Sequence, residues 1–185
     1  MLLYRLQTAF STLPDPNGWL VTLLLFAGFA GVTFVILRLS GLFSFSPTRL
    51  PLRSVLLLIT VAVFTPSLPE EVLYRVLLLP HPTESVSFET RLAWSGLSLV
   101  LFVAAHPFIA WSVWHWSRRI FYRPAFLVIV ALLGLVCTVA YLYTGSVWAP
   151  VSIHWATIVG WKLFFGGPDF NLGKDRKSPP LTRGD

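Results

Sequence analysis

Long stretches without a charged side chain constrain this sequence most. No Asp, Glu, Lys or Arg occurs in residues 16–37, 54–69, 92–117 or 124–161. A helix needs about 20 apolar residues to cross the hydrocarbon core of a bilayer, so these stretches are membrane-sized. Only 12% of the 185 residues are charged, against roughly a quarter in soluble domains. The sequence therefore predicts a multi-pass integral membrane protein and excludes a soluble enzyme, a DNA-binding domain or a disordered chain.

The apolar sequence divides into five predicted transmembrane helices. The stretch 124–161 is too long for one helix, and it divides at the turn-forming residues 143–146. Pro66 and Pro69 interrupt the second segment, and Pro107 is expected to kink the third. The predicted helices are residues 19–39, 54–79, 92–116, 124–143 and 146–165. We expect an all-α polytopic membrane helix bundle, with an interfacial lead-in at 1–18, a transmembrane domain at 19–165 and a disordered polar tail at 166–185.

The basic residues predict how the bundle is oriented. Cytoplasmic loops of membrane proteins carry an excess of Lys and Arg. With five helices, ten basic residues share one side of the membrane: Arg38, Arg49, Arg53, Arg118, Arg119, Arg123, Lys174, Arg176, Lys177 and Arg183. The opposite side holds Arg5 and Arg91, beside Glu84 and Glu89. We therefore expect the N-terminus outside and the C-terminus inside, in a bacterial inner membrane or an equivalent membrane.

The remaining bulk properties limit cofactors and partners. The single cysteine, Cys137, excludes a disulfide framework and a cysteine-based metal site. The net charge of +6 is accounted for by the basic loops, so we expect membrane lipid and no nucleic acid as a partner. The sequence does not indicate an oligomeric state.

Ionisable groups inside the apolar segments are the candidates for function, because each costs a few kcal/mol in the bilayer. They are Glu70, Glu71, Arg75, His106 and His154. Lys162 lies near the inner end of the last segment, where its side chain can reach the interface. His81 and His115 lie in a loop and among interfacial tryptophans, and we interpret both as surface residues.

The segment Glu70-Glu71-Val72-Leu73-Tyr74-Arg75 is the most informative of these. On a helix, Glu71 and Arg75 are four residues apart and can form an ion pair. Glu70 points about 100° away and has no obvious countercharge, a setting that suits a general acid or base. The alternative is that all three groups form a buried polar contact that only holds helices together.

Helix geometry places three of these groups at a similar depth. At about 1.5 Å per residue, Glu70 lies ~15 Å, His154 ~12 Å and His106 ~21 Å below the outer ends of their segments. Three different helices thus bring two histidines level with a glutamate, which favours a site over isolated structural contacts.

These motifs together resemble the CAAX protease and bacteriocin-processing family of intramembrane endopeptidases, also called CPBP or Abi. Glu70-Glu71-x-x-x-Arg75 matches the E-E-x-x-x-R motif of this family, and Phe102-x-x-x-His106 matches its F-x-x-x-H motif. The segment 145–154 resembles the one that carries the second histidine of the family, here His154. The resemblance covers about residues 54–165, and the chain is similar to the type II CAAX prenyl endopeptidases.

The resemblance implies a role for each matched residue. Glu70 and His106 would activate a water, His154 would stabilise the oxyanion, and Glu71 with Arg75 would orient the site. The substrate would be a peptide or a prenylated protein, cleaved at the membrane. We expect no cofactor, because Arg75 beside the glutamates would repel a cation. A zinc ion bound by Glu70, His106 and His154 is the alternative.

One departure from the family pattern affects the expected activity. The family usually has Asn, or sometimes Asp, four residues after the second histidine, where this chain has Ile158. Ile158 cannot donate a hydrogen bond, and Thr157 is the candidate substitute. A catalytically weak or inactive relative acting as an immunity or scaffold protein is therefore the main alternative, and a proton- or ion-handling transporter is a third.

Overall fold

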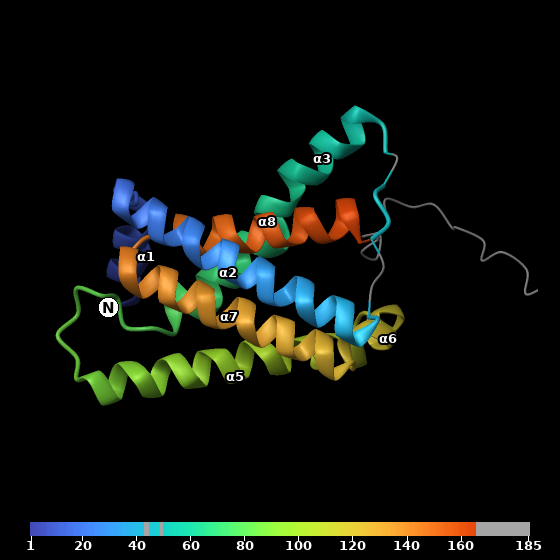
Figure 1. Ribbon diagram of the computed structural model, residues 1–185. Helices are drawn as coiled ribbons and strands as arrows, with labels where there is room; N and C mark the ends of the chain where they lie inside the picture. Colours follow the sequence, from blue (N-terminus) through green and yellow to red (C-terminus); the bar gives the residue numbers. More distant parts are fainter. Residues whose placement is uncertain (43–44, 49, 166–185) are drawn as a thin grey trace, which may run out of the picture.

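The computed structural model describes residues 1–42, 45–48 and 50–165, and nearly all of them lie in helices (Figure 1). The helices are α1 (Leu2–Ser11), α2 (Pro16–Ser40), α3 (Leu52–Ala62), η1 (Val63–Ser67), α4 (Leu68–Glu71), η2 (Val72–Leu77), α5 (Phe88–Ser112), η3 (His115–Ser117), α6 (Arg118–Phe121), α7 (Pro124–Thr144) and α8 (Trp148–Phe164). The described part contains no β-strand, only an isolated bridge between Ser46 and Phe165. The predicted all-α bundle is confirmed. The predicted tail at 166–185 lies outside the described residues.

Among the described residues, four helical segments are long and apolar enough to cross a membrane. They are α2, the continuous run Leu52–Leu77, α5 and α7. The fifth predicted segment forms α8, whose 17 residues reach the lower limit of length for a membrane-spanning helix. The five predicted segments are thus all helical, and four of them have ample length for a span. Each begins and ends within a few residues of its predicted bounds.

Helix α7 is the centre of the bundle. Half of the residues in its most apolar stretch are buried, compared with 11% in the corresponding stretches of the Leu52–Leu77 run and of α5. It packs against α2, α5 and α8, and Phe126, Val130 and Leu133 bring its side chains into the core with Phe102 of α5 and Ile153 of α8. The lipid-facing sides of the other helices carry the exposed Leu, Val and Phe side chains, as expected where the solvent is hydrocarbon.

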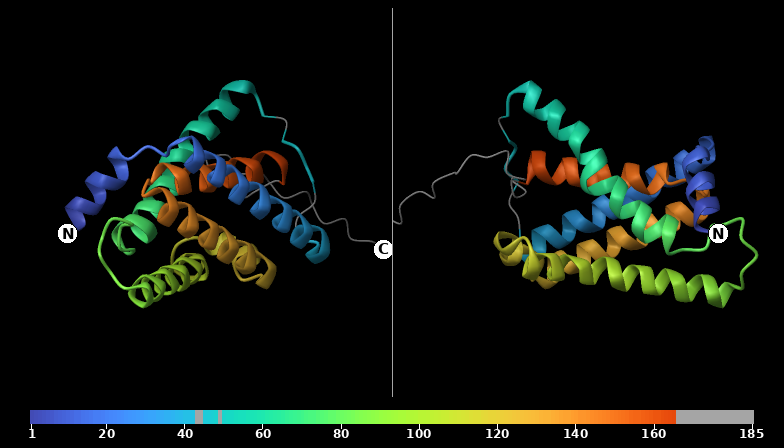
Figure 2. Two further views of the ribbon diagram at one scale, coloured as in Figure 1. Left: turned by 60° about the vertical axis from the view of Figure 1, so that its left-hand side comes forward. Right: turned by 180° about the vertical axis from the view of Figure 1, so that it is seen from behind.

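The second membrane segment is broken in the middle. Thr65 has an extended backbone (φ −155°, ψ 115°) directly before Pro66, the conformation that a following proline favours. As a result, α3 leans away from the other helices while α4 and η2 run through the bundle (Figures 1 and 2). At Pro107, in contrast, the backbone of α5 stays helical.

One end of the bundle is closed by α1. The Arg5 guanidinium contacts the Glu84 carboxylate at 2.6 Å and 2.8 Å, and the Ala9 carbonyl accepts from the backbone N–H of Val147 at 3.1 Å. The hydrogen bond from Arg5 holds the pKa of Glu84 below its usual value. This end joins α1 to the 78–87 loop and to the turn between α7 and α8.

His81 belongs to this closed end, which corrects its prediction as a surface residue. It is only 2% exposed. Its Nε2 is 3.0 Å from the Gly145 carbonyl and its Nδ1 is 2.7 Å from Thr83 Oγ1. The sequence could not reveal this, because the loop folds back on a turn 64 residues later. His115 is exposed, as predicted.

Candidate active site

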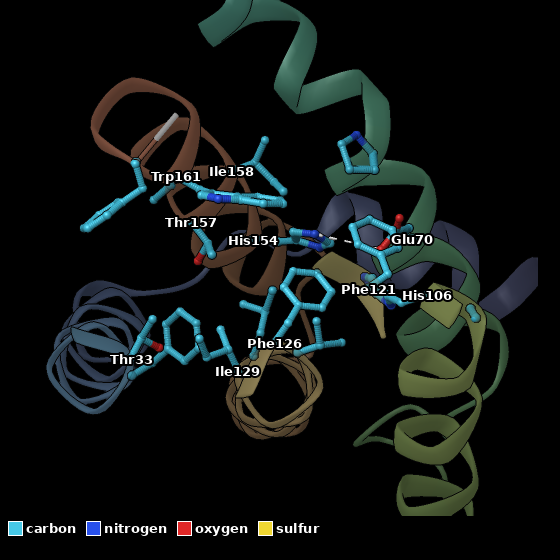
Figure 3. A pocket seen from close by; sticks show the side chains of 18 of the residues that line it. Thr33, Glu70, His106, Phe121, Phe126, Ile129, His154, Thr157, Ile158 and Trp161 are labelled. Carbon is cyan, nitrogen blue, oxygen red and sulfur yellow. Dashed lines mark ion pairs between the residues drawn. The ribbon is translucent and has the colours of Figure 1, made fainter. Parts of the chain in front are cut away.

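A cavity of about 460 Å³ lies between the helices, and the predicted polar residues meet at one side of it (Figure 3). Its walls come from α2, the broken second span, α5, α7 and α8, and most of the lining is apolar. Glu70, His106 and His154 all line it. The three residues that the sequence predicts at one depth therefore share a single cavity.

Behind the cavity, Glu71 is held by two partners. Its carboxylate lies 3.2 Å from Arg75 Nε, and both side chains are fully buried. The structure thus contains the ion pair predicted from their spacing. The same carboxylate accepts from His154 Nδ1 at 2.7 Å, a contact that joins α4 to α8. Because the carboxylate can only accept, Nδ1 of His154 carries a proton.

Arg75 is anchored on its other side by α7. Its Nη2 donates to the Gly134 carbonyl at 2.9 Å, and its guanidinium carbon lies 4.5 Å from the centre of the Phe102 ring. A Cβ on Gly134 would lie 2.7 Å from Leu99 Cδ1 and 3.3 Å from Arg75 Nη2. Because Gly134 has no side chain, α7 and α5 can pack closely around the Arg75 guanidinium.

Glu70 lies between the cavity and the buried group formed by Glu71, Arg75 and His154. Its Oε2 is 3.9 Å from His154 Nε2, and no direct hydrogen-bond partner for this oxygen is found among the residues that the structure covers. A separation of 3.9 Å is too long for a hydrogen bond, and this oxygen is itself buried. The Glu70 side chain is 26% exposed, whereas that of His154 is 3% exposed, so Glu70 faces the open space.

The charges of Glu70, Glu71, Arg75 and His154 can sum to zero in two ways. A buried group of charges is least costly when its net charge is zero. Glu71 and Arg75 neutralise each other. Glu70 and His154 then have a combined charge of zero in either of two states. In one, His154 is protonated and Glu70 is ionised; in the other, Glu70 is protonated and His154 is neutral. This arrangement can move a proton between a carboxylate and an imidazole without creating a net buried charge.

His106 is oriented by its own helix. Its Nδ1 donates to the Phe102 carbonyl at 2.9 Å, which leaves Nε2 as a hydrogen-bond acceptor. The Phe102 ring packs edge-on against both histidines, with ring centres 5.2 Å from His106 and 6.0 Å from His154. The imidazole of His154, and not that of His106, lies 3.9 Å from Glu70. The joint action of Glu70 and His106 on one water stays a prediction.

The residues predicted to support an oxyanion are placed less favourably. Thr157 and Ile158 both line the cavity. The Thr157 hydroxyl, however, donates to the Ile153 carbonyl at 2.8 Å, so its single proton is already used. Sequence reasoning also missed Tyr74, which lines the cavity. It lies four residues after Glu70, and helical spacing alone could have put both on the same face.

Zinc is the alternative cofactor expected from the sequence. Across the described part of the chain, no three side chains of the His, Cys, Asp and Glu types come together as a metal site. Glu70, His106 and His154 line one cavity without forming a three-ligand cluster.

Comparison with known proteins gives one match. A family model described as type II CAAX prenyl endopeptidase Rce1-like matches residues 52–159, more than half of the chain. The matched range runs from α3 into α8. It contains the polar residues described above: Glu70, Glu71, Arg75, His106 and His154. Neither a curated protein nor a solved structure matches the chain.

Proposed function

Because the chain belongs to the Rce1-like family of type II CAAX prenyl endopeptidases, a family of membrane proteases, we propose that its cavity hydrolyses a peptide bond with water activated by Glu70. The protein is a multi-pass integral membrane protein. The observation that carries the proposal is the convergence of Glu70, His106 and His154 from three helical segments on one largely apolar cavity.

Glu70 is the proposed general base. A water hydrogen-bonded to the Glu70 carboxylate loses a proton to it as the water oxygen adds to the carbonyl carbon of the substrate. His106 accepts a hydrogen bond from the same water through Nε2, since its Nδ1 is committed to the Phe102 carbonyl. When the C–N bond breaks, Glu70 returns the proton to the leaving amine.

His154 is the proposed stabiliser of the oxyanion. In its protonated form, Nδ1–H donates to Glu71, and Nε2–H points toward the side of the cavity where Glu70 lies. Glu71 and Arg75 act as positioning residues, because they hold this imidazole in one orientation and balance its charge. Preorganised donors in a dry site can lower a reaction barrier by several kcal/mol.

The lining of the cavity favours a lipid-modified substrate. Its apolar wall is continued beyond the polar cluster by Phe29 and Phe34 of α2 and by Ile129 of α7. A farnesyl or similar chain would fit this wall, while the adjacent peptide bond meets Glu70. We therefore propose a prenylated peptide or protein as the substrate, as the family description indicates.

The test is cleavage of a fluorescent farnesylated C-terminal peptide by the purified protein in liposomes. We expect His106→Ala and His154→Ala to lower kcat by about 10²-fold or more, while the exposed His115→Ala retains wild-type kcat. Cleavage by a folded His106→Ala or His154→Ala variant at the wild-type rate would contradict the proposal. A chelator should leave the rate unchanged; loss of activity that zinc restores would instead support the metal alternative.

A second candidate function is favoured by one observation. The Ile158 side chain has no hydrogen-bond donor, and the Thr157 hydroxyl already donates to the Ile153 carbonyl. Neither side chain can therefore donate to an oxyanion. A folded wild-type protein that cleaves no member of a panel of prenylated and unmodified peptides would support a non-catalytic immunity or scaffold role.

A further inference from the structure

Hydrolysis at this site, if the proposed function holds, needs donors for the carbonyl oxygen of the substrate. Negative charge develops on this oxygen as water adds, and loss of one donor typically costs about 10²–10³ in rate. His154 can provide one donor. Ile158 provides none, and Thr157 donates to its own helix. A further donor must therefore come from elsewhere in the cavity lining.

Two lining hydroxyl groups have no hydrogen-bond partner within the part of the chain that the structure describes. One is Thr33 of α2, whose Oγ1 is buried and unpaired. Figure 3 shows Thr33 on the opposite side of the cavity from Glu70. The other is the phenol of Tyr74 in η2, which is half-buried and lines the cavity.

Tyr74 occupies the right place for this task. It follows Glu70 by four residues in a helical run, so both side chains point to one side. Tyr74 and Glu70 both line the cavity. Its ring packs edge-on against Phe102 with centres 5.2 Å apart, on the same aromatic side chain that contacts both histidines.

The backbone of Tyr74 is also fixed. Its carbonyl accepts a hydrogen bond of 2.6 Å from Ser98 Oγ of α5, and Ser98 is fully buried. A donor held by its ring and by its backbone loses little further freedom when it meets the substrate, which is the condition for effective stabilisation of a developing charge.

We propose that Tyr74 is a further catalytic residue, whose phenol O–H donates a hydrogen bond to the carbonyl oxygen of the bond being cleaved. As the water oxygen bonds to the carbonyl carbon, the carbonyl π pair moves to oxygen, and the water proton passes to Glu70. Tyr74 keeps its proton throughout. Collapse of the intermediate restores the carbonyl, breaks the C–N bond and sends the Glu70 proton to the amine. Tyr74 thus supplies the contact that Ile158 cannot.

The experiment compares Tyr74→Phe with wild type in liposomes, using the farnesylated peptide. The phenyl ring retains the packing on Phe102, so only the O–H is lost. We expect kcat to fall about 10²–10³-fold with KM nearly unchanged. Tyr143→Phe, the same change at an exposed position on α7, should leave both constants at wild-type values.

The outcomes separate this inference from the proposed function. If wild type cleaves the peptide and Tyr74→Phe does so with equal kcat, Tyr74 is not catalytic although the enzyme is. A change in KM alone, or a fall in kcat matched by a lower unfolding midpoint in detergent, also overturns the inference. If wild type cleaves nothing, it is the proposed function that fails.

Discussion

Arg75 is the residue on which the buried charges of the site depend. It neutralises Glu71, which in turn binds His154, and it is tied to α7 through the Gly134 carbonyl. Removing one partner of a buried pair leaves an uncompensated charge, which is more damaging than never having had the pair. The same Arg75–Glu71 pair therefore stabilises the folded protein and holds the His154 imidazole in its orientation.

Replacing Arg75 by Met tests this coupling. The side chains are similar in length, but the charge and the donor to Gly134 are lost. We expect the free energy of unfolding to fall by about 3–5 kcal/mol, as measured by denaturant titration in detergent micelles. Arg53→Met, at an exposed position, should change it by less than about 0.5 kcal/mol. Equal stabilities of the two variants would contradict a structural role for the buried pair.

Individual residues were predictable where a local rule applies. The Glu71–Arg75 pair follows from a spacing of four, and the polar residues of the cavity follow from the cost of placing them in a bilayer. The contact between His154 and Glu71 spans 83 residues, and no local rule predicts which of two adjacent glutamates a histidine contacts. The burial of His81 is a second contact of this kind.

At the scale of helices, the break at Thr65 positions the site and the docking of α1 closes one end of the bundle. Hydrophobic segments of the right length were enough to predict α2, α5, α7 and α8. Which proline interrupts its helix could not be deduced, since Pro66 and Pro107 both lie within apolar runs. Helix α1 docks through Arg5, whose partner Glu84 is 79 residues away.

The docking of α1 should depend on pH. Because the pKa of Glu84 is lower in the folded protein, the contact with Arg5 stabilises the folded state above the unfolded pKa of the carboxyl. That contribution is lost as pH falls through the lower, folded value. A spin label at Ser11→Cys, at an exposed position on α1, should be immobile near neutral pH and gain mobility as acid protonates Glu84.

Glu84→Gln provides the control for this titration. Without the carboxylate, the label should be mobile at neutral pH, and acid should change its mobility little. A label that stays immobile down to low pH in the wild-type background would show that packing alone holds α1 in place. The native Cys137 is buried and should not take the label.

For the whole molecule, the charged residues separate to the two ends of the bundle. The loop with Glu84 lies at the end where α1 docks, while α6, with its two arginines, lies at the other (Figure 1). The architecture was predictable because each apolar segment must form a helix and successive helices must cross in opposite directions. The cavity was not, since it depends on how side chains from five segments pack together.

Cysteine labelling tests the predicted orientation. With the N-terminus outside, Ser85→Cys should react with an impermeant maleimide added to intact cells. Ser112→Cys, at the opposite end of α5, should react only after the membrane is opened. Both positions are exposed. Labelling of both from the outside would contradict five membrane crossings, and the reverse pattern would contradict the orientation.

The role of Glu70 as the base that activates water is the central claim, and Glu70→Gln tests it most directly. The amide has nearly the same shape but cannot accept the proton. The measurement is the single-turnover rate of farnesylated-peptide cleavage in liposomes, with Glu89→Gln, at the exposed start of α5, as the matched control. We predict a fall of about 10²–10⁴-fold for Glu70→Gln and a wild-type rate for Glu89→Gln. Cleavage by Glu70→Gln at the wild-type rate would contradict the account.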